Sequence, residues 1–243
     1  MPRYRSACRS ITCATGPRDD GTSLSVHRVG REAQPVVVID DFTADPDALR
    51  AVALASTFGP AVEHYPGIRA ALPKAYLPAQ LAVLADVLGP LLGRSGAVEV
   101  VDASFSIVTT PPEKLDVRQR VPHCDAFRAD RIALVHYLAP EGGDGTAFFR
   151  HRSTGFETID EERAPIFFGQ LDAEFRYGGV PPARYVAGDT PLFERTMAVE
   201  ARYNRALVYP SYLLHSGAIG PEAVLSSDPA LGRLTVTAFL SVG

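Results

Sequence analysis

The sequence predicts an α+β protein in which an antiparallel β-sandwich or jelly roll follows two N-terminal helices. Three observations lead to this prediction. Two amphipathic helical segments come early in the chain, before residue 94. From Val98 onward the chain carries short runs rich in β-branched and aromatic residues. Turn clusters such as "APEGGDG" separate these runs, as expected for a series of short strands.

The composition is that of an ordinary globular protein. The chain has 243 residues, of which 46% are hydrophobic and 21% charged, enough for one full core and one domain. The net charge of −4 and the pI of about 5.9 give no basis for a nucleic-acid or anionic-membrane partner. No apolar run approaches the length of a membrane span, so we expect no membrane association.

Residues 1–33 are predicted to be a flexible extension, and residues 34–243 a single domain. The extension is basic and rich in Ser and Thr, has little to bury, and lacks the apolar stretch of a secretory signal. Cys8, Cys13 and Cys124 are too few and too uneven for a disulfide framework. This favours a reducing, cytoplasmic setting, with Cys124 as a small core side chain.

The first elements are a strand, a helix, a loop and a second helix. "PVVVIDDF" (35–42) indicates a buried strand. The helix over 43–58 has Asp45 as its cap and Pro46 at its first position. "GPAVEHYPGIRAALP" (59–73) is rich in turn formers and indicates a loop. The second helix covers 78–93 and is ended by its Gly and Pro residues.

The later elements are strands with one helical insert. The runs that predict strands are 98–110, 131–138, 145–152, 205–217 and 233–242. Between the third and fourth runs, the charge and apolar spacing of residues 158–179 predict a helix.

Three residues in this half form a candidate metal site. His123 and Asp125 are two apart, just after a proline and before an apolar run, and His215 ends a later strand. Two imidazoles and one carboxylate are the facial triad of non-haem Fe(II) oxygenases. The alternatives are a surface turn for the His-x-Asp pair and a core histidine for His215.

Several segments, in this order, resemble the 2-oxoglutarate/Fe(II) dioxygenase superfamily, and within it the prolyl-hydroxylase-like branch. They are "PHCD", "HYL", "GGDGTAFF", "ALVYPSYLLHSG" and "RLTVTAFL", and the resemblance covers residues 104–242. "VVVIDDF" and "HYPGIRA" are similar to a little-characterised bacterial group of the same superfamily.

The resemblance implies a double-stranded β-helix (a cupin-like jelly roll) with the N-terminal helices packed on it. It also implies Fe(II), 2-oxoglutarate and O₂ as cofactor and co-substrates. The metal ligands would be His123, Asp125 and His215. The 2-oxoglutarate carboxylate would meet Arg233, assisted by Thr235 and Tyr137. The gap between His215 and Arg233 is longer than in the family, and its Gly, Pro and Ser content indicates an extended loop.

The expected reaction is hydroxylation or another oxidation of a C–H bond in a small molecule. We expect the substrate, an amino acid or natural-product intermediate, to carry a carboxylate that meets Arg69, near Phe127 and Arg150. The alternative for Arg69 is a solvated loop side chain. His136 and His151 are poorer site candidates. Two other functions stay open: a jelly-roll metalloenzyme that uses no 2-oxo acid, and a non-catalytic binding module.

Overall fold

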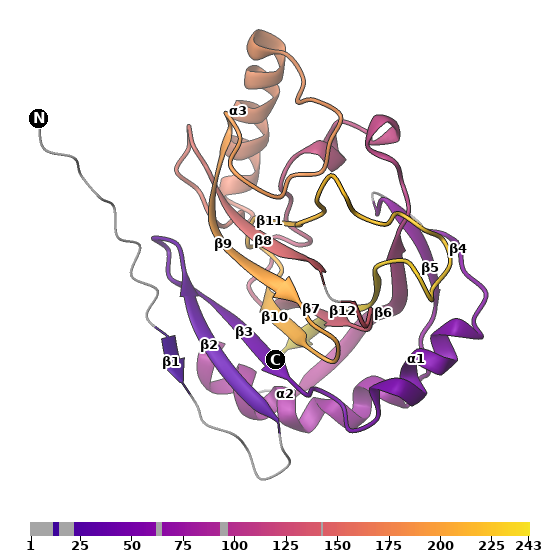
Figure 1. Cartoon of the computed structure of the whole chain (residues 1–243). Coiled ribbons are helices and arrows are strands. Elements are labelled where there is room, and N and C mark those ends of the chain that lie inside the picture. The colour runs from indigo at the N-terminus through magenta and orange to yellow at the C-terminus, as the bar shows by residue number, and fades with distance from the viewer. Residues whose placement is uncertain (1–11, 15–21, 62–64, 93–96, 142) are drawn as a thin grey trace, which may run out of the picture.

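The computed structural model describes residues 12–14, 22–61, 65–92, 97–141 and 143–243 (Figure 1). The helices are α1 (Pro46–Leu54), α2 (Tyr76–Leu92) and α3 (Arg163–Gly178), with short 3₁₀ turns at Pro112–Lys114 and Arg118–Arg120. The strands are β1 (Thr12–Ala14), β2 (Ser23–Val29), β3 (Gln34–Asp40), β4 (Gly59–Pro60), β5 (Gly67–Ala71), β6 (Val98–Val108), β7 (Arg131–Tyr137), β8 (Gly143–His151), β9 (Phe193–Ala201), β10 (Ala206–Pro210), β11 (His215–Gly217) and β12 (Leu234–Val242).

The strands form two antiparallel sheets, and the described chain is mostly β-sheet with few helices (Figure 1). The larger sheet has nine strands in the order β1-β2-β3-β10-β7-β12-β6-β5-β4. The smaller sheet has three strands in the order β11-β8-β9. Among the described residues, no helix is long and apolar enough to cross a membrane.

The core has layers on both faces of the large sheet. On one face, Ala133 and Leu207 of the large sheet pack with Phe148 and Val199 of the small sheet. The other face is covered by α1 and α2, whose core-facing side chains include Leu49, Ala53, Leu77, Leu84 and Leu88. The outer face of the small sheet packs against α3 through Phe167 and Leu171. The inner face of the large sheet therefore faces the small sheet.

Local signals predicted the start of α1 correctly. The Asp45 side chain accepts a hydrogen bond from the Ala48 amide at 2.9 Å, and Pro46 occupies the first turn. An N-terminal cap of this kind satisfies one of the amides that the helix leaves unpaired. The helix predicted over 158–179 is present as α3.

Two N-terminal predictions were wrong. β2 lies inside the predicted flexible extension, and its side chains Leu24, Val26 and Val29 are buried. The sheet therefore begins before residue 34. The predicted loop over 59–73 contains β4 and β5, and β5 pairs with β6 so that Arg69 lies opposite Ser106. Arg69 thus lies on a strand and not on a loop. Most of the predicted extension, residues 1–11 and 15–21, lies outside the described residues.

Two differences concern the strand-rich half. The run 205–217 divides into β10 in the large sheet and β11 in the small sheet. β9 follows α3 and was not predicted, although Phe193, Val199 and Ala201 are its buried side chains.

Candidate metal centre

His123 and His215 come together through a short β-bridge between distant segments. Each donates its amide to the carbonyl of the other at 2.9 Å. Two residues along, the Asp125 amide donates to the Ser211 carbonyl at 2.8 Å. The His-x-Asp pair thus lies in the segment before β7, and it is hydrogen-bonded to Ser211 and to His215, the first residue of β11.

The three side chains converge on one point. The ligand atoms of His123, Asp125 and His215 all lie within 4.8 Å of one another. Asp125 Oδ1 is 3.6 Å from His123 Nε2, and Asp125 Oδ2 is 3.3 Å from His215 Nε2. The two imidazole centroids are 4.5 Å apart. Two imidazoles and one carboxylate at these separations can ligate a single transition-metal ion.

Surrounding groups fix the protonation of the ligands. His215 Nδ1 lies 2.8 Å from the Leu213 carbonyl, an acceptor, so Nδ1 carries the proton and Nε2 offers its lone pair towards Asp125. Burial lowers the pKa of His215 to about 4, which keeps the imidazole neutral at neutral pH. Burial raises the pKa of Asp125, and the nearby charges of His123 and Arg69 oppose that shift.

A row of polar side chains crosses the inner face of the large sheet. In the register, Arg69 lies opposite Ser106, Ser106 opposite Thr235, and Thr235 opposite Tyr137. Directly opposite residues in antiparallel strands project on the same face. Tyr137 packs in the cluster between the sheets, so the whole row faces the small sheet. The sheet therefore brings Arg69, predicted to bind the substrate, into one row with Thr235 and Tyr137, predicted to assist 2-oxoglutarate binding.

Arg233 joins the end of this row. It stands just before β12, and its Cζ lies 5.4 Å from the centroid of the Tyr137 ring. Its Nε donates to the Asp144 carbonyl at 2.7 Å and its Nη2 to the Gly145 carbonyl at 2.9 Å. Two backbone carbonyls thus hold the guanidinium in one orientation.

Two buried donors beside the row lack an acceptor. Tyr65 Oη and Arg69 Nε are inaccessible to solvent and have no hydrogen-bond partner among the described residues. The Arg69 Cζ lies 4.7 Å from the Tyr65 ring centroid. Arg69 Nη1 is 4.0 Å from Asp102, the outer limit of an ion pair. Burial raises the pKa of Tyr65, so its hydroxyl is a donor at neutral pH. Two unpaired donors side by side suit an acceptor such as a carboxylate.

The family of the chain follows from its match to a family model. Residues 20–240 match the model described as a family of unknown function, DUF6445. The chain belongs to the DUF6445 family. A comparison of this DUF6445 chain with curated proteins finds no match.

Several solved structures are similar to this DUF6445 chain at low identity. The non-haem α-ketoglutarate-dependent epimerase SnoN from nogalamycin biosynthesis is 15% identical, with a TM-score of 0.44 over 86% of this chain and 78% of that chain. HygX from Streptomyces hygroscopicus with iron bound is 12% identical, with a TM-score of 0.46 over 86% and 82%. An N-substituted L-amino acid dioxygenase from Burkholderia ambifaria AMMD is 10% identical, with a TM-score of 0.40 over 87% and 83%.

Arg150 of the DUF6445 chain lies in a buried ion-pair cluster. Its side chain is 9% exposed and pairs with the carboxylates of Glu157 and Glu194. Both carboxylates hold the guanidinium within its own cluster, and a contact of Arg150 with the substrate stays a prediction. The partners could not be inferred from the sequence, because they lie seven and 44 residues away.

Phe127 stays a prediction. Its ring is 37% exposed and lies edge-on to Phe168 of α3, with centroids 6.1 Å apart. It lines a surface depression with residues 128–130, 160–162 and 242–243, which includes none of the metal-ligand candidates.

His136, His151 and Cys124 have packing roles in this DUF6445 chain. His136 is buried between Tyr76 Oη and Asn204 Oδ1, and His151 is buried against Glu174 and Thr154. Cys124 packs beside the cluster that contains Phe149.

Sequence reasoning missed Tyr65 and Tyr209. The Tyr209 ring lies 4.8 Å from the His215 ring, and the Asp125 charge is among the causes that raise the pKa of Tyr209, after burial. Tyr65 was not identified as a site residue because its segment was predicted to be a loop. The sequence signal for Tyr209 was its position six residues before His215, in the largely apolar run "ALVYPSYLLHSG".

Proposed function

We propose that the chain is a non-haem Fe(II)/2-oxoglutarate-dependent oxygenase that oxidises a C–H bond of a small, carboxylate-bearing molecule. The observation that carries the proposal is the convergence of His123, Asp125 and His215, whose ligand atoms lie within 4.8 Å of one another. A two-histidine, one-carboxylate face leaves coordination positions open for a co-substrate and O₂. The prolyl-hydroxylase-like branch and the choice among amino acids and natural-product intermediates stay predictions.

The proposed scaffold is a double-stranded β-helix. In its favour, the chain crosses between the sheets several times: β6, β7, β10 and β12 belong to the large sheet, and β11 and the consecutive pair β8 and β9 to the small one. The His123 segment adds to the small sheet through its bridge to β11. Within the large sheet, β10, β7, β12 and β6 are direct neighbours. Repeated crossing between two facing sheets is expected of an eight-stranded jelly roll.

The residues present fit a divalent metal. His215 offers a neutral imidazole whose orientation is fixed by the Leu213 carbonyl. The Asp125 side chain is 16% exposed, and its desolvation raises the pKa of the carboxyl, so its negative charge is costly to keep without a cation nearby. When bound, Fe(II) and 2-oxoglutarate would supply the activation of O₂, and His123, Asp125 and His215 would hold the metal.

The proposed anchor for the distal carboxylate of 2-oxoglutarate is Arg233. Its orientation by two backbone carbonyls leaves part of the guanidinium for the co-substrate. Thr235 lies on the same inner row, and its hydroxyl donates to the Ser106 carbonyl at 3.2 Å. The Tyr137 hydroxyl is 2.8 Å from Thr146 Oγ1, which positions it beside Arg233. These groups would hold the co-substrate by hydrogen bonds to its carboxylate.

Arg69 is the proposed contact for the substrate carboxylate. Burial raises the pKa of Asp125, and the charge of Arg69 is among those that oppose this rise, which supports a position of Arg69 near the metal-ligand candidates. Its unpaired Nε and the unpaired Tyr65 hydroxyl are both donors. A substrate carboxylate would satisfy both. Arg69 would thereby orient the substrate, because a charge-assisted bond to a fixed strand residue restricts its position.

Anaerobic addition of Fe(II) and 2-oxoglutarate to the purified protein tests the proposal. We expect the weak visible charge-transfer band of the Fe(II)–2-oxoglutarate chelate, lost in His215→Ala and weakened in Arg233→Ala. Metal binding without the band would indicate a jelly-roll metalloenzyme that does not use 2-oxoglutarate. A protein that binds no metal would be a binding module, and the proposal would be wrong.

A further inference from the structure

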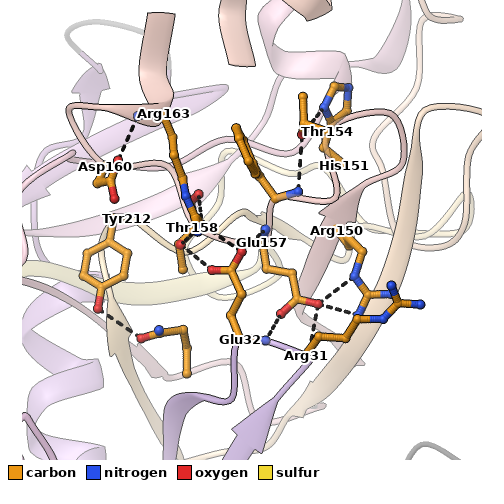
Figure 2. Close-up of polar contacts among 12 residues, drawn as sticks. Arg31, Glu32, Arg150, His151, Thr154, Glu157, Thr158, Asp160, Arg163 and Tyr212 are labelled. Atoms are coloured by element: carbon orange, nitrogen blue, oxygen red, sulfur yellow. Dashed lines mark hydrogen bonds and ion pairs between the residues drawn. The ribbon is translucent and has the colours of Figure 1, made fainter. Parts of the chain in front are cut away.

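Glu157 is a fully buried carboxylate outside the metal site. The residue is 1% exposed and lies between β8 and α3. Its Oε1 accepts from Arg150 Nε at 2.7 Å and from the Arg31 amide at 2.9 Å, and Arg150 Nη2 also donates to it. Its Oε2 accepts from the Glu32 amide at 2.9 Å. Figure 2 shows these contacts converging on one side chain. A charge with this many donors is held firmly in place.

The turn between β2 and β3 is shaped to receive this carboxylate. Gly30 has φ +67°, and a Cβ at this position would lie 2.0 Å from Glu157 Oε2. The contact is reciprocal, because the Glu157 amide donates to Glu32 Oε1 at 3.1 Å. Arg163 donates to the same Glu32 oxygen at 2.8 Å (Figure 2). The backbone at Glu157 is therefore held at the amide and at the side chain.

The carbonyl of Glu157 connects this cluster to the segment before His215. It accepts from the Leu214 amide at 2.8 Å, and the Ile159 amide donates to the Tyr212 carbonyl at 2.8 Å. Thr158 and Leu213 form the antiparallel bridge between these bonds. Residues 157–159 are thus paired with residues 212–214.

One planar peptide group transmits this pairing to the metal ligand. The Leu214 N–H and the Leu213 carbonyl belong to the same peptide unit, which is planar. The bond from the Leu214 amide to the Glu157 carbonyl therefore restricts the direction of the Leu213 carbonyl. That carbonyl is the acceptor, at 2.8 Å, for Nδ1 of His215. The orientation of the imidazole thus depends on where the Glu157 backbone lies.

We propose that Glu157 is a positioning residue for His215: its buried carboxylate fixes the backbone that orients the Leu213 carbonyl, and this carbonyl aims the imidazole at the metal. The consequence for metal binding rests on the proposed role of His215 as a ligand. The predicted effect on the orientation of the imidazole does not depend on that role. A hydrogen-bond acceptor for the non-ligating ring nitrogen of a metal-bound histidine orients the ring and influences metal affinity.

The test is Glu157→Gln, which keeps the size of the side chain and removes its charge. A glutamine presents an N–H₂ group to a pocket of donors, so the carboxamide cannot satisfy Arg150 and both turn amides together. Co(II), which gives visible bands sensitive to ligand geometry, serves as the probe metal. We expect the Kd for Co(II) to rise about tenfold and the bands to shift, as for other outer partners of metal ligands.

Two further variants separate positioning from general stability. Asp40→Asn breaks another ion pair, between β3 and Arg205, that does not contact residues 212–214. It should lower the free energy of unfolding but leave the Kd for Co(II) within about twofold, because it does not change the geometry of the metal-ligand candidates. Arg150→Lys keeps the positive charge but loses the planar fork, so it should fold and give a smaller rise in Kd.

A measurement on the metal-free protein keeps the two proposals apart. The Nδ1–H proton of His215, followed by ¹H–¹⁵N NMR, should exchange at least about tenfold faster in Glu157→Gln than in the parent or in Asp40→Asn. If the parent binds no Co(II), the proposed function fails and this exchange rate still tests the positioning. Unchanged exchange and unchanged Kd in Glu157→Gln, or in Arg150→Lys should the first variant not fold, would overturn the inference.

Discussion

At the scale of single residues, the site combines metal-ligand candidates from segments 90 residues apart with an imidazole whose tautomer is fixed. His215 Nδ1 is held by the Leu213 carbonyl, and burial lowers the pKa of the ring to about 4. We expect His215→Ala to weaken Co(II) binding more than about 100-fold, because it removes a ligand outright and not only a supporting partner. A Co(II) titration followed in the visible range measures this.

The control for this prediction is His27→Ala. His27 lies on β2, where its ring contacts Ser25 Oγ at 3.1 Å. It should keep the parental Kd. If His215→Ala binds Co(II) as tightly as His27→Ala does, His215 is not a ligand.

Arg233 and Arg69 are the two guanidinium groups near the inner row, and their roles can be separated. Arg233→Lys should weaken 2-oxoglutarate binding at least about tenfold, because an ammonium keeps the charge but loses the bidentate fork. Arg69→Ala should leave that affinity within about twofold and instead raise the KM for the substrate. Calorimetry with Mn(II) in place of Fe(II) measures the 2-oxoglutarate affinity. The reverse pattern would make Arg69 the co-substrate anchor.

At the scale of elements, a hydrogen bond joins α2 to the large sheet. Tyr76, the first residue of α2, places Oη 2.7 Å from Nδ1 of buried His136 on β7. The other ring nitrogen faces Asn204 Oδ1, an acceptor, at 3.1 Å. Nε2 therefore carries the proton, and Nδ1 accepts from Tyr76.

Tyr76→Phe should lower the free energy of unfolding by about 1–3 kcal/mol, because it leaves Nδ1 of His136 buried and unpaired. Urea denaturation measures the change. Tyr177, with 85% of its surface exposed, provides the matched control, and Tyr177→Phe should stay within about 0.5 kcal/mol of the parent. Equal effects of the two substitutions would mean that this hydrogen bond does not stabilise the fold.

The sequence predicted the elements whose signals are local. β7 and β12 are dense in β-branched and aromatic residues, and α1 carries its own cap. β5 was missed because "GIRAA" stands beside turn formers, and its pairing with β6 stabilises it as a strand. Register across a sheet is set by long-range contacts and not by the short segment itself.

The same distinction explains which site residues could be predicted. The metal-ligand candidates were found from residue type and order, since a His-x-Asp pair and a distant histidine are visible in the sequence. Tyr65 could not be found, because only the pairing of β5 with β6 places its segment beside the row through Arg69 and Ser106. The ion pair of Arg150 with Glu157 could not be predicted either, because it depends on how the chain folds.

At the scale of the whole molecule, buried ionisable groups connect the stability of the metal-free protein to pH. Burial lowers the pKa of His136 and of His215 to about 4, below the ordinary 6.5. Between pH 6.5 and 4 the unfolded chain therefore binds protons that the folded chain does not. Stability is complete above pH 6.5 and is lost as the pH falls towards 4. Asp125 acts in the opposite sense, because burial raises its pKa and its contribution grows as the pH falls.

We therefore expect the metal-free protein to lose stability on acidification, by up to about 3 kcal/mol for each of the two histidines and less where Asp125 offsets the loss. A bound divalent metal needs neutral imidazoles and an ionised carboxylate, so it stabilises only the deprotonated site. Saturating Co(II) should raise the Tm at pH 7.5, and this increment should vanish near pH 5 as protons compete for the ligands. Thermal denaturation across this range, with and without Co(II), measures both effects. His215→Ala should abolish the increment and reduce the acid sensitivity, whereas a metal-dependent rise in Tm that persists in this variant would place the metal elsewhere.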